Sequence, residues 1–156
     1  MPPVPVLIIR DARESPRKCT IAALRGLPNI TIRGWQRDTP IDISGTTFLH
    51  PGGDALTLAD ADRPLLIVDS SWHHLAQIMN DLTGRHVKRS IPAGFVSAYP
   101  RKSRIYQDPQ SGLASVEALY IALTILGGRR DDILEPYHFR NQFLELNANK
   151  FSVLNS

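Results

Sequence analysis

The chain has 156 residues, of which 42% are hydrophobic and 21% are charged, and these proportions are typical of a folded globular protein rather than a disordered one. Its single cysteine, Cys19, excludes an internal disulfide framework. No signal peptide or membrane span is recognisable in the sequence, so we expect a cytoplasmic protein that has no membrane partner.

Charged residues are distributed unevenly along the chain, although the net charge is only +3. Six basic residues and no acidic residue lie between Arg85 and Arg104, whereas residues 54–82 contain five aspartates and one arginine. Such clustering of positive charge is typical of a protein that binds a polyanion. Ordinary solvated faces would produce the same clustering, so charge alone leaves both interpretations open.

Hydrophobic patterns along the chain predict an alternation of strands and helices. Short apolar or alternating runs predict strands at residues 6–9, 29–35, 45–53 (interrupted by Pro51), 64–71 and 85–95. Helical spacing predicts helices at residues 20–26, 54–63, 72–84, 115–127 and 136–151. Ser115 is the expected N-cap of the fourth of these helices. The alternation predicts an α/β protein with a mostly parallel sheet flanked by helices, followed by a helical segment.

Polar residues follow three of the predicted strands, in the segments "RDARESPRKCT", "LHPGGD" and "VDSSW". In open α/β sheets, ligands bind where such loops meet at the carboxyl ends of parallel strands. Asp69 stands at the end of the most apolar strand, where its carboxylate could orient a ribose or a ligand amine, or accept a proton. Alternatively, Asp69, Ser70 or Ser71 caps the helix that begins near Trp72. The two roles are compatible with each other.

Trp72 is a candidate for stacking on a base or on a cationic ligand, and a place in the hydrophobic core is the alternative. The sequence contains no GxGxxG, GxxxxGK[ST] or GxSxG motif, which argues against a dinucleotide fingerprint, a P-loop and a hydrolase nucleophile elbow. Cys19 has no partner at metal-ligand spacing, and the adjacent His73 and His74 would point in different directions on a helix. We therefore expect no metal site.

Several segments match a known family in their order and spacing: "SPRKCT", "FLHPGGDALTLADADRPLLIVDSSW", "LASVEALYIALTILGG" and "NQFLELN". The chain resembles the family that includes the aminocarboxypropyltransferase of small-subunit ribosomal RNA, and the resemblance covers nearly the whole chain. Its most specific parts are the DxSW stretch and the SVEALYIAL stretch. The segment "SAYPRKSRIYQDPQSG" is longer and more basic than the corresponding "ANPVNYG" of the family, and Ser70 replaces a cysteine.

The resemblance implies a SPOUT-like fold, in which a mostly parallel sheet contains a trefoil knot, an exception to the general absence of knots in proteins. It also implies a helical C-terminal lobe. On this basis we expect an α/β domain at residues 1–90 that binds RNA and the cofactor, and a helical domain at residues 91–156 that completes the cofactor pocket. The resemblance further implies a monomer.

The resemblance also implies an enzyme that uses S-adenosylmethionine and no metal. In such a reaction N3 of a uridine or pseudouridine attacks the cofactor, the 3-amino-3-carboxypropyl group passes to the RNA, and 5′-methylthioadenosine is released. The positioning of the cofactor decides which of its carbons reacts. The expected substrate is small-subunit ribosomal RNA, alone or in a pre-ribosomal particle.

Carried over residue by residue, the resemblance assigns roles to individual side chains. Asp69 is the base candidate, because N3 of uracil must lose a proton to attack. The expected cofactor-binding residues are Thr20, Leu49, Pro51, Val68 (through its backbone), Trp72, Ile91, Leu113, Ser115 and Ala118. The expected RNA-binding residues, whose positive charges would contact phosphates, are Arg10, Lys18, Lys88, Arg89, Arg101, Lys102 and Arg104. Tyr99 and Tyr106 lie among these charges and could stack on a base.

Two other functions are compatible with the sequence. One is an RNA methyltransferase with the same kind of fold, which would release S-adenosylhomocysteine. The other is a non-catalytic RNA-binding factor in ribosome assembly that retains the pocket without turnover. The product formed from S-adenosylmethionine separates the first alternative from the transferase, and RNA binding without cofactor binding would identify the second.

Overall fold

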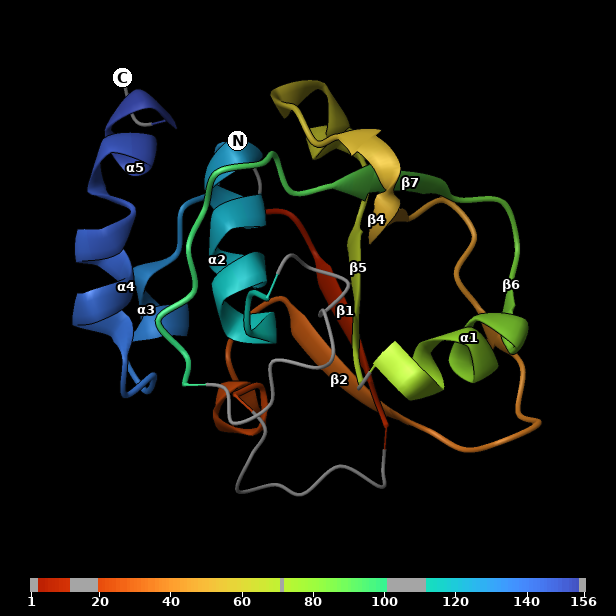
Figure 1. Cartoon of the computed structure of the whole chain (residues 1–156). Coiled ribbons are helices and arrows are strands. Elements are labelled where there is room, and N and C mark those ends of the chain that lie inside the picture. The colour runs from red at the N-terminus through yellow and green to blue at the C-terminus, as the bar shows by residue number, and fades with distance from the viewer. Residues whose placement is uncertain (1–2, 12–19, 71, 101–111, 155–156) are drawn as a thin grey trace.

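The sheet at the centre of the protein is parallel. A computed structural model describes residues 3–11, 20–70, 72–100 and 112–154, without the side chains of residues 72 and 73. Within these ranges the five-stranded sheet has the strand order β2 (Ile30–Trp35), β1 (Val6–Asp11), β5 (Leu65–Asp69), β4 (Thr47–Ala55) and β7 (Val87–Ser90). Each neighbouring pair is parallel. The carboxyl ends of β1 and β5 therefore lie at the same edge, at the lower end of the molecule in Figure 1.

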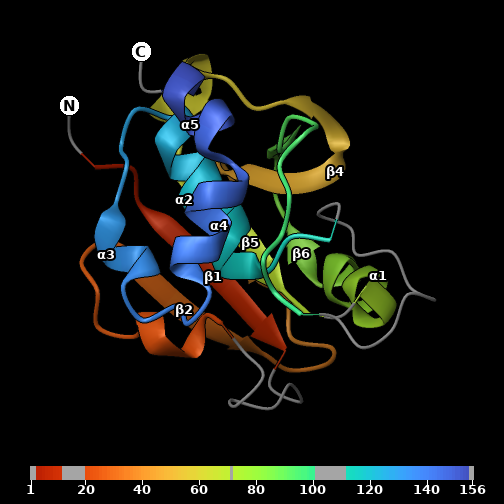
Figure 2. The same cartoon turned by 60° about the vertical axis from the view of Figure 1, so that its left-hand side comes forward.

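Helices cover both faces of this sheet (Figures 1 and 2). On one face lies α1 (Trp72–Asn80), near the short parallel pair β3 (Ile41–Asp42) and β6 (Leu82–Thr83). On the other face lies α2 (Ser115–Ile125), and beyond it lie α3 (Asp131–Leu134), α4 (Arg140–Leu146) and α5 (Ala148–Leu154). The connections contain the 3-10 helices η1 (Ala22–Leu24) and η2 (Leu58–Asp62).

The hydrophobic core of the described residues is divided by the sheet. On β1, Ile8 packs in the cluster that contains α2, whereas Ile9 packs in the cluster that contains Ile78 of α1. This division follows from the alternation of side chains along a strand. All residues of α2 from Val116 to Thr124 are buried, as expected for a helix that is apolar on almost every face. The predicted α/β class with a mostly parallel sheet is confirmed.

The helices α2 to α5 pack on the sheet as part of the same core. Leu119 of α2, Ile133 of α3 and Phe151 of α5 belong to the cluster that contains Ile8. The division into domains at residues 1–90 and 91–156 stays a prediction. In the described ranges, no helix has the length and the apolar composition needed to cross a membrane.

Strand β4 continues beyond Pro51, where the sequence predicts an interruption. Its pairing with β7 changes register between Leu49 and Asp54, so an irregularity in the ladder accommodates the proline. A proline lacks the N–H group that a central ladder requires, and bulges are where strands tolerate one. Because the strand extends to Ala55, the helix expected at residues 54–63 is reduced to the short η2.

The helix expected at residues 136–151 is divided into α4 and α5 at Asn147. Asn147 is buried, and its Oδ1 accepts a 2.7 Å hydrogen bond from the N–H of Val96. Its Nδ2 donates to the carbonyl oxygens of Val96 and Phe143, both at 2.8 Å. An asparagine side chain that bonds to the backbone competes with a continuous helix. The same contacts attach residues 91–100 to the C-terminal helices.

Candidate functional site

The hydroxyl groups of Thr20 and Ser115 and the carboxylate of Asp69 meet at the N-terminus of α2. Ser115 Oγ donates a 2.5 Å hydrogen bond to Asp69 Oδ1, and the N–H of Val116 donates a 3.2 Å hydrogen bond to Thr20 Oγ1. Thr20, Asp69 and Ser115 are each partly exposed. This polar group lies at the carboxyl end of β5, the edge at which α/β proteins bind ligands.

The alternation of side chains along β5 explains why Asp69 faces α2. Ile67, two residues earlier, belongs to the core cluster that contains α2, so Asp69 lies on the same face of the sheet. Ser115 is the first residue of α2 and therefore stands where that helix meets the strand end. A carboxylate and a hydroxyl are thus placed side by side by one buried strand and one buried helix.

Ser115 is not the N-cap of α2, contrary to the expectation from the sequence. The N-cap is Ala114, which has no side-chain acceptor, and its backbone N–H donates a 2.7 Å hydrogen bond to Glu117 Oε1. An acidic residue at the third helical position can satisfy the N-cap N–H in this way. The hydroxyl of Ser115 is consequently used for the contact with Asp69.

Glu117 organises the segments around the beginning of α2. Its side chain is fully buried and accepts further hydrogen bonds from Ser97 Oγ at 2.6 Å, the N–H of Ala98 at 2.9 Å and Tyr137 Oη at 3.0 Å. A buried carboxylate needs such donors to compensate for the loss of water. Glu117 thereby joins several stretches of the chain at one point. The sequence reasoning missed this role, although a lone acid in an otherwise apolar helix was a signal for it.

Several of the expected cofactor-binding residues belong to the core cluster on the α2 face of the sheet. Leu49, Leu113 and Ala118 are buried in the core cluster that contains α2, and Ile91 packs against the same cluster. They come from β4, from the start of α2 and its preceding turn, and from the segment after β7. The fold therefore brings these four residues together around one face of the sheet.

The other expected cofactor-binding residues have different surroundings. The side chain of Val68 packs in the cluster on the α1 face, while its expected contact to a ribose involves backbone atoms. Pro51 is exposed on β4. Trp72 is the first residue of α1, and its side chain lies outside the described part of the structure. The pocket wall expected from Pro51 and Trp72 stays a prediction.

Comparisons with known proteins identify the family of the chain. A family model described as "Ribosome biogenesis protein, C-terminal" matches residues 46–155. The 16S rRNA aminocarboxypropyltransferase of Halobacterium salinarum is 32% identical over 140 residues, which cover 88% of this chain and 78% of the relative. The chain belongs to the 16S rRNA aminocarboxypropyltransferase family. The relative of the same name from Methanopyrus kandleri is 31% identical over 155 residues, which cover 94% of this chain and 87% of the relative.

A solved structure shares the fold of this family member. The SAM-dependent rRNA:acp-transferase Tsr3 from Vulcanisaeta distributa matches it with a TM-score of 0.73 and 25% identity, over 96% of this chain and 81% of that chain. The parallel sheet with helices on both faces is common to the two proteins. The family resemblance inferred from the sequence motifs is confirmed.

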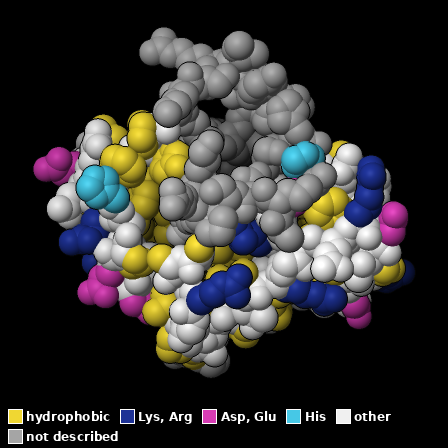
Figure 3. Space-filling model, turned by 90° about the horizontal axis from the view of Figure 1, so that it is seen from below, with side chains coloured by type: hydrophobic (Ala, Val, Ile, Leu, Met, Phe, Trp, Pro, Cys, Tyr) yellow, Lys and Arg dark blue, Asp and Glu magenta, His cyan; other side chains and the backbone are white. Residues whose placement is uncertain are grey.

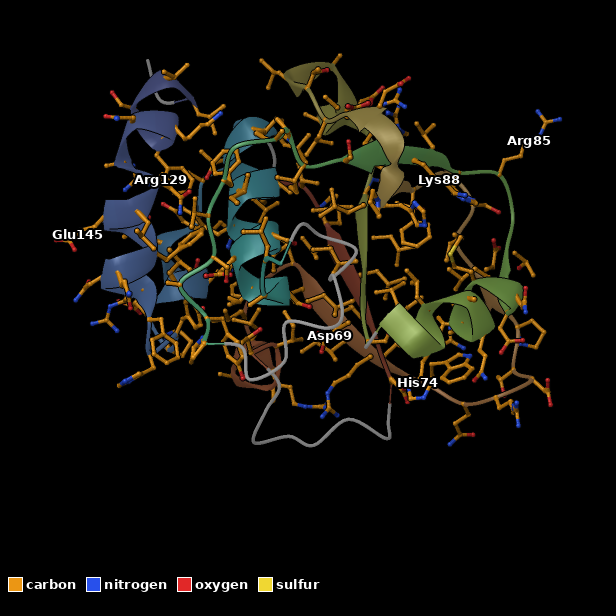
Figure 4. All side chains as sticks on the ribbon, viewed as in Figure 1. Asp69, His74, Arg85, Lys88, Arg129 and Glu145 are labelled. Carbon is orange, nitrogen blue, oxygen red and sulfur yellow. The ribbon has the colours of Figure 1, made fainter. Side chains whose placement is uncertain are left out.

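The basic residues expected to bind RNA in this family member occupy different parts of the described structure. Arg10, the residue before the last of β1, pairs with Asp69, whereas Figure 4 shows Lys88 of β7 in the upper part of the molecule, away from Asp69. Figure 3 views the carboxyl ends of β1 and β5 and shows Lys and Arg side chains in the middle of this face, with Asp and Glu mostly at its margins. Four other residues that we expect to bind RNA lie outside the described ranges: Lys18, Arg101, Lys102 and Arg104.

Arg89 takes part in an ion-pair network between η2 and β7. Its Nε donates a 3.1 Å hydrogen bond to Oδ1 of Asp60, a residue that is 4% exposed, and Arg63 Nη2 contacts the same oxygen at 2.5 Å. A phosphate would have to compete with this buried carboxylate for the guanidinium of Arg89. Its role in RNA binding therefore stays a prediction.

A contact between a histidine and a buried aspartate lies on the α1 face of the sheet. His74 Nδ1 lies 2.9 Å from Asp11 Oδ2, and Asp11 is fully buried at the end of β1. Figure 4 shows His74 and Asp69 toward the same lower end of the molecule. No local pattern predicts this pair, because the two residues are far apart in the sequence. Across the residues that the structure describes, no group of three or more His, Cys, Asp or Glu side chains could hold a metal ion.

His50 shapes the turn that follows it in β4. Burial lowers the pKa of His50 below its ordinary value, and the nearby charges of Lys88 and His86 act in the same direction. A neutral ring can accept a hydrogen bond at Nδ1, and the N–H of Gly52 donates one there at 2.9 Å. The turn around Pro51 is therefore held by the His50 ring, which accepts this hydrogen bond.

A cleft of about 700 Å³ lies at the opposite end of α2 from the polar group. Its lining includes Leu58 of η2, Leu126 and Arg130. Because α2 begins at the carboxyl end of β5, these residues lie toward the other edge of the sheet. The cleft is therefore separate from the candidate site.

Proposed function

We propose that the protein transfers the 3-amino-3-carboxypropyl group of S-adenosylmethionine to N3 of a uridine or pseudouridine in small-subunit ribosomal RNA, with release of 5′-methylthioadenosine. Two relatives are named 16S rRNA aminocarboxypropyltransferase, and the structural relative is named a SAM-dependent rRNA:acp-transferase. The observation that carries the proposal is the meeting of Thr20, Asp69 and Ser115 at the N-terminus of α2. This group combines hydroxyls that can bind an amino-acid-like ligand with a carboxylate that can accept a proton.

The described residues fit the cofactor. Its aminocarboxypropyl end carries an ammonium and a carboxylate, for which the site offers the carboxylate of Asp69 and the hydroxyls of Thr20 and Ser115. Adenine needs largely apolar walls, and we assign them to apolar residues on the α2 face of the sheet, among them Leu49 and Leu113. When bound, the cofactor supplies a carbon that its sulfonium makes electrophilic.

Asp69 is the residue that we assign to proton removal. N3 of uracil must lose its proton to attack, and a carboxylate at the strand end can accept one. The hydrogen bond from Ser115 Oγ to Oδ1 restricts the orientation of this carboxylate. Thr20 holds its own segment against α2 by accepting a hydrogen bond from the N–H of Val116. Such positioning determines which carbon of the cofactor meets the RNA base.

Further properties belong to the same proposal. We expect the RNA substrate to be presented in a pre-ribosomal particle, and the protein to act as a cytoplasmic monomer. The Lys and Arg side chains on the face shown in Figure 3 support an RNA-facing edge. We also propose that the parallel sheet contains the SPOUT-like trefoil knot, which a complete chain trace through residues 101–111 would test. Light scattering after gel filtration would test the monomer.

The experiment that tests the proposed function is an analysis of both products by mass spectrometry. The protein is incubated with S-adenosylmethionine and either small-subunit ribosomal RNA or particles from cells that lack the gene. We expect 5′-methylthioadenosine together with RNA that has gained one aminocarboxypropyl group. RNA from cells with and without the gene should differ by the same single modification.

Two other outcomes would replace the proposal. S-Adenosylhomocysteine together with methylated RNA would identify a methyltransferase. If the protein binds RNA but calorimetry detects no binding of S-adenosylmethionine, the protein is a non-catalytic assembly factor. A parallel reaction with the Asp69→Asn variant shows whether product formation depends on the candidate site.

A further inference from the structure

Arg10 lies beside Asp69 on the sheet face that α2 covers. The two residues are directly paired in the parallel register of β1 and β5. Ile8, two residues before Arg10, belongs to the core cluster that contains α2, whereas Ile9 belongs to the cluster on the α1 face. Because side chains alternate along a strand, Arg10 shares the α2 face with Asp69.

This arrangement places a guanidinium and a carboxylate on neighbouring strands at the ligand-binding edge. Neighbouring strands lie about 4.8 Å apart, so the two side chains start close together. Arg10 is partly exposed, and Asp69 is already oriented by Ser115. An α-amino acid group carries an ammonium and a carboxylate on one carbon, which matches this pair of charges. Asp69 repels the carboxylate of such a ligand, which favours its binding on the side of Arg10.

We propose that Arg10 binds the carboxylate of the aminocarboxypropyl group of S-adenosylmethionine. This role rests on the proposed function. It places Arg10 in the cofactor site, whereas the resemblance implied a contact with an RNA phosphate. A guanidinium holds a carboxylate through two parallel hydrogen bonds, which determine direction as well as distance. Because this carboxylate belongs to the transferred group, the contact favours the cofactor orientation that presents the aminocarboxypropyl carbon to the RNA.

The test compares two ligands that differ in this carboxylate alone. Calorimetry measures the affinity of the full chain for S-adenosylmethionine and for its decarboxylated analogue, which keeps the ammonium and the sulfonium. We expect the wild-type protein to bind the analogue about tenfold more weakly or worse, because a charge-assisted contact is lost. The Arg10→Met variant should bind S-adenosylmethionine about as weakly as the wild-type protein binds the analogue. The affinity for the analogue itself should differ by less than about twofold between the variant and the wild-type protein.

Matched variants separate this contact from effects on folding and on net charge. Arg33→Met removes an arginine from the adjacent strand β2, where Arg33 pairs with Ile9 and therefore lies on the opposite face of the sheet. It should retain the full discrimination between the two ligands. Arg10→Lys keeps the charge without the planar guanidinium and should retain part of the discrimination. Thermal unfolding of each variant verifies that it is folded.

The outcomes distinguish the role of Arg10 from the proposed function. Equal affinities of the wild-type protein for the two ligands, or equal losses for both in Arg10→Met, would overturn the assignment to the carboxylate. If Arg10→Met keeps the discrimination but lowers RNA affinity and its salt dependence, Arg10 belongs to the RNA surface. If the wild-type protein binds neither ligand, the proposed function itself is wrong, and the role of Arg10 is rejected with it.

Discussion

The hydroxyl of Ser115 donates a 2.5 Å hydrogen bond to the carboxylate of Asp69, and this contact joins residues that are 46 positions apart. It connects the end of β5 to the beginning of α2. In a member of the aminocarboxypropyltransferase family, this connection orients the carboxylate that we assign to proton removal. The first two predictions concern the two partners of this hydrogen bond.

Asp69→Asn should lower the rate of aminocarboxypropyl transfer by about a hundredfold or more, because an amide of nearly the same shape cannot accept the N3 proton. The affinity for S-adenosylmethionine, measured by calorimetry, should fall by a smaller factor of about tenfold, because the amide also loses the charge that faces the cofactor's ammonium. Single-turnover kinetics at saturating RNA provide the measurement. A rate close to that of the wild-type protein would rule out Asp69 as the base.

Ser115→Ala should lower the rate by a smaller factor, about tenfold, because the carboxylate remains and loses one orienting hydrogen bond. Ser115→Thr keeps the hydroxyl and serves as the matched control. Both variants should unfold at nearly the temperature of the wild-type protein, because Ser115 is partly exposed and does not cap α2. Equal rates for Ser115→Ala and the wild-type protein would show that the contact does not orient Asp69.

Glu117→Gln should destabilise the fold by about 2–4 kcal/mol, because it converts one buried acceptor oxygen into a donor that faces other donors. The donors in question are the backbone N–H groups of Ala98 and Ala114 and the hydroxyls of Ser97 and Tyr137. Urea unfolding measures the change in the free energy of unfolding. Glu145→Gln on α4 is the control, because Glu145 is exposed and its replacement should change that free energy by less than about 0.5 kcal/mol.

Trp72→Ala should weaken S-adenosylmethionine binding more than about tenfold, since we expect its ring to form one wall of the cofactor pocket. Trp72→Phe retains an aromatic wall and should bind the cofactor with intermediate affinity. Calorimetry on both variants checks the expectation. Wild-type affinity in the alanine variant would remove Trp72 from the pocket.

Reversal of charge at Arg101, Lys102 and Arg104 should weaken RNA binding and reduce its dependence on salt. Each phosphate contact with a single strand contributes about 0.7 to the slope of log affinity against log salt, so the slope should fall by about two if the three residues contact phosphates. Cofactor affinity should be unchanged, and it serves as the internal control. Loss of cofactor binding as well would indicate misfolding instead of a lost RNA contact.

Asp132 should contribute to the decrease in the free energy of unfolding at acidic pH. A hydrogen bond from Arg130, whose Nη2 lies 2.5 Å from Oδ2, holds the pKa of Asp132 below its ordinary value of 3.8. A carboxylate with a lowered pKa stabilises the fold fully above 3.8, and the contribution is lost as the pH falls through the folded-state pKa. The Asp132 side chain is 38% exposed, so solvent screening limits the contribution to about 0.5 kcal/mol.

The measurement for Asp132 is urea unfolding of the wild-type protein and Asp132→Asn at several pH values. The two proteins should differ at pH 7 and should become equally stable toward pH 2. A difference that stays constant down to the lowest pH would show that the charge of Asp132 is not responsible.

The sequence by itself was sufficient to predict the α/β class, the mostly parallel sheet, the buried helix α2 and the family. These features depend on local information, because the burial of a strand or helix is encoded in the spacing of its own apolar residues. The DxSW and SVEALYIAL motifs were sufficient for the family because they combine specific residues in a fixed order. The errors occurred where a side chain forms hydrogen bonds that compete with a local preference, either with a distant segment or within the same helix end. Asn147 divides the expected last helix through its contacts with Val96, and Glu117 replaces Ser115 in capping α2.

The tertiary structure alone decided which polar residues meet. The register of β1 and β5 places Arg10 beside Asp69, and the packing of α2 on the sheet brings Ser115 to the same point. It likewise joins His74 to the buried Asp11 on the opposite face. No local pattern encodes these pairs, because strand order, register and the docking of a helix are set by the burial of the whole core.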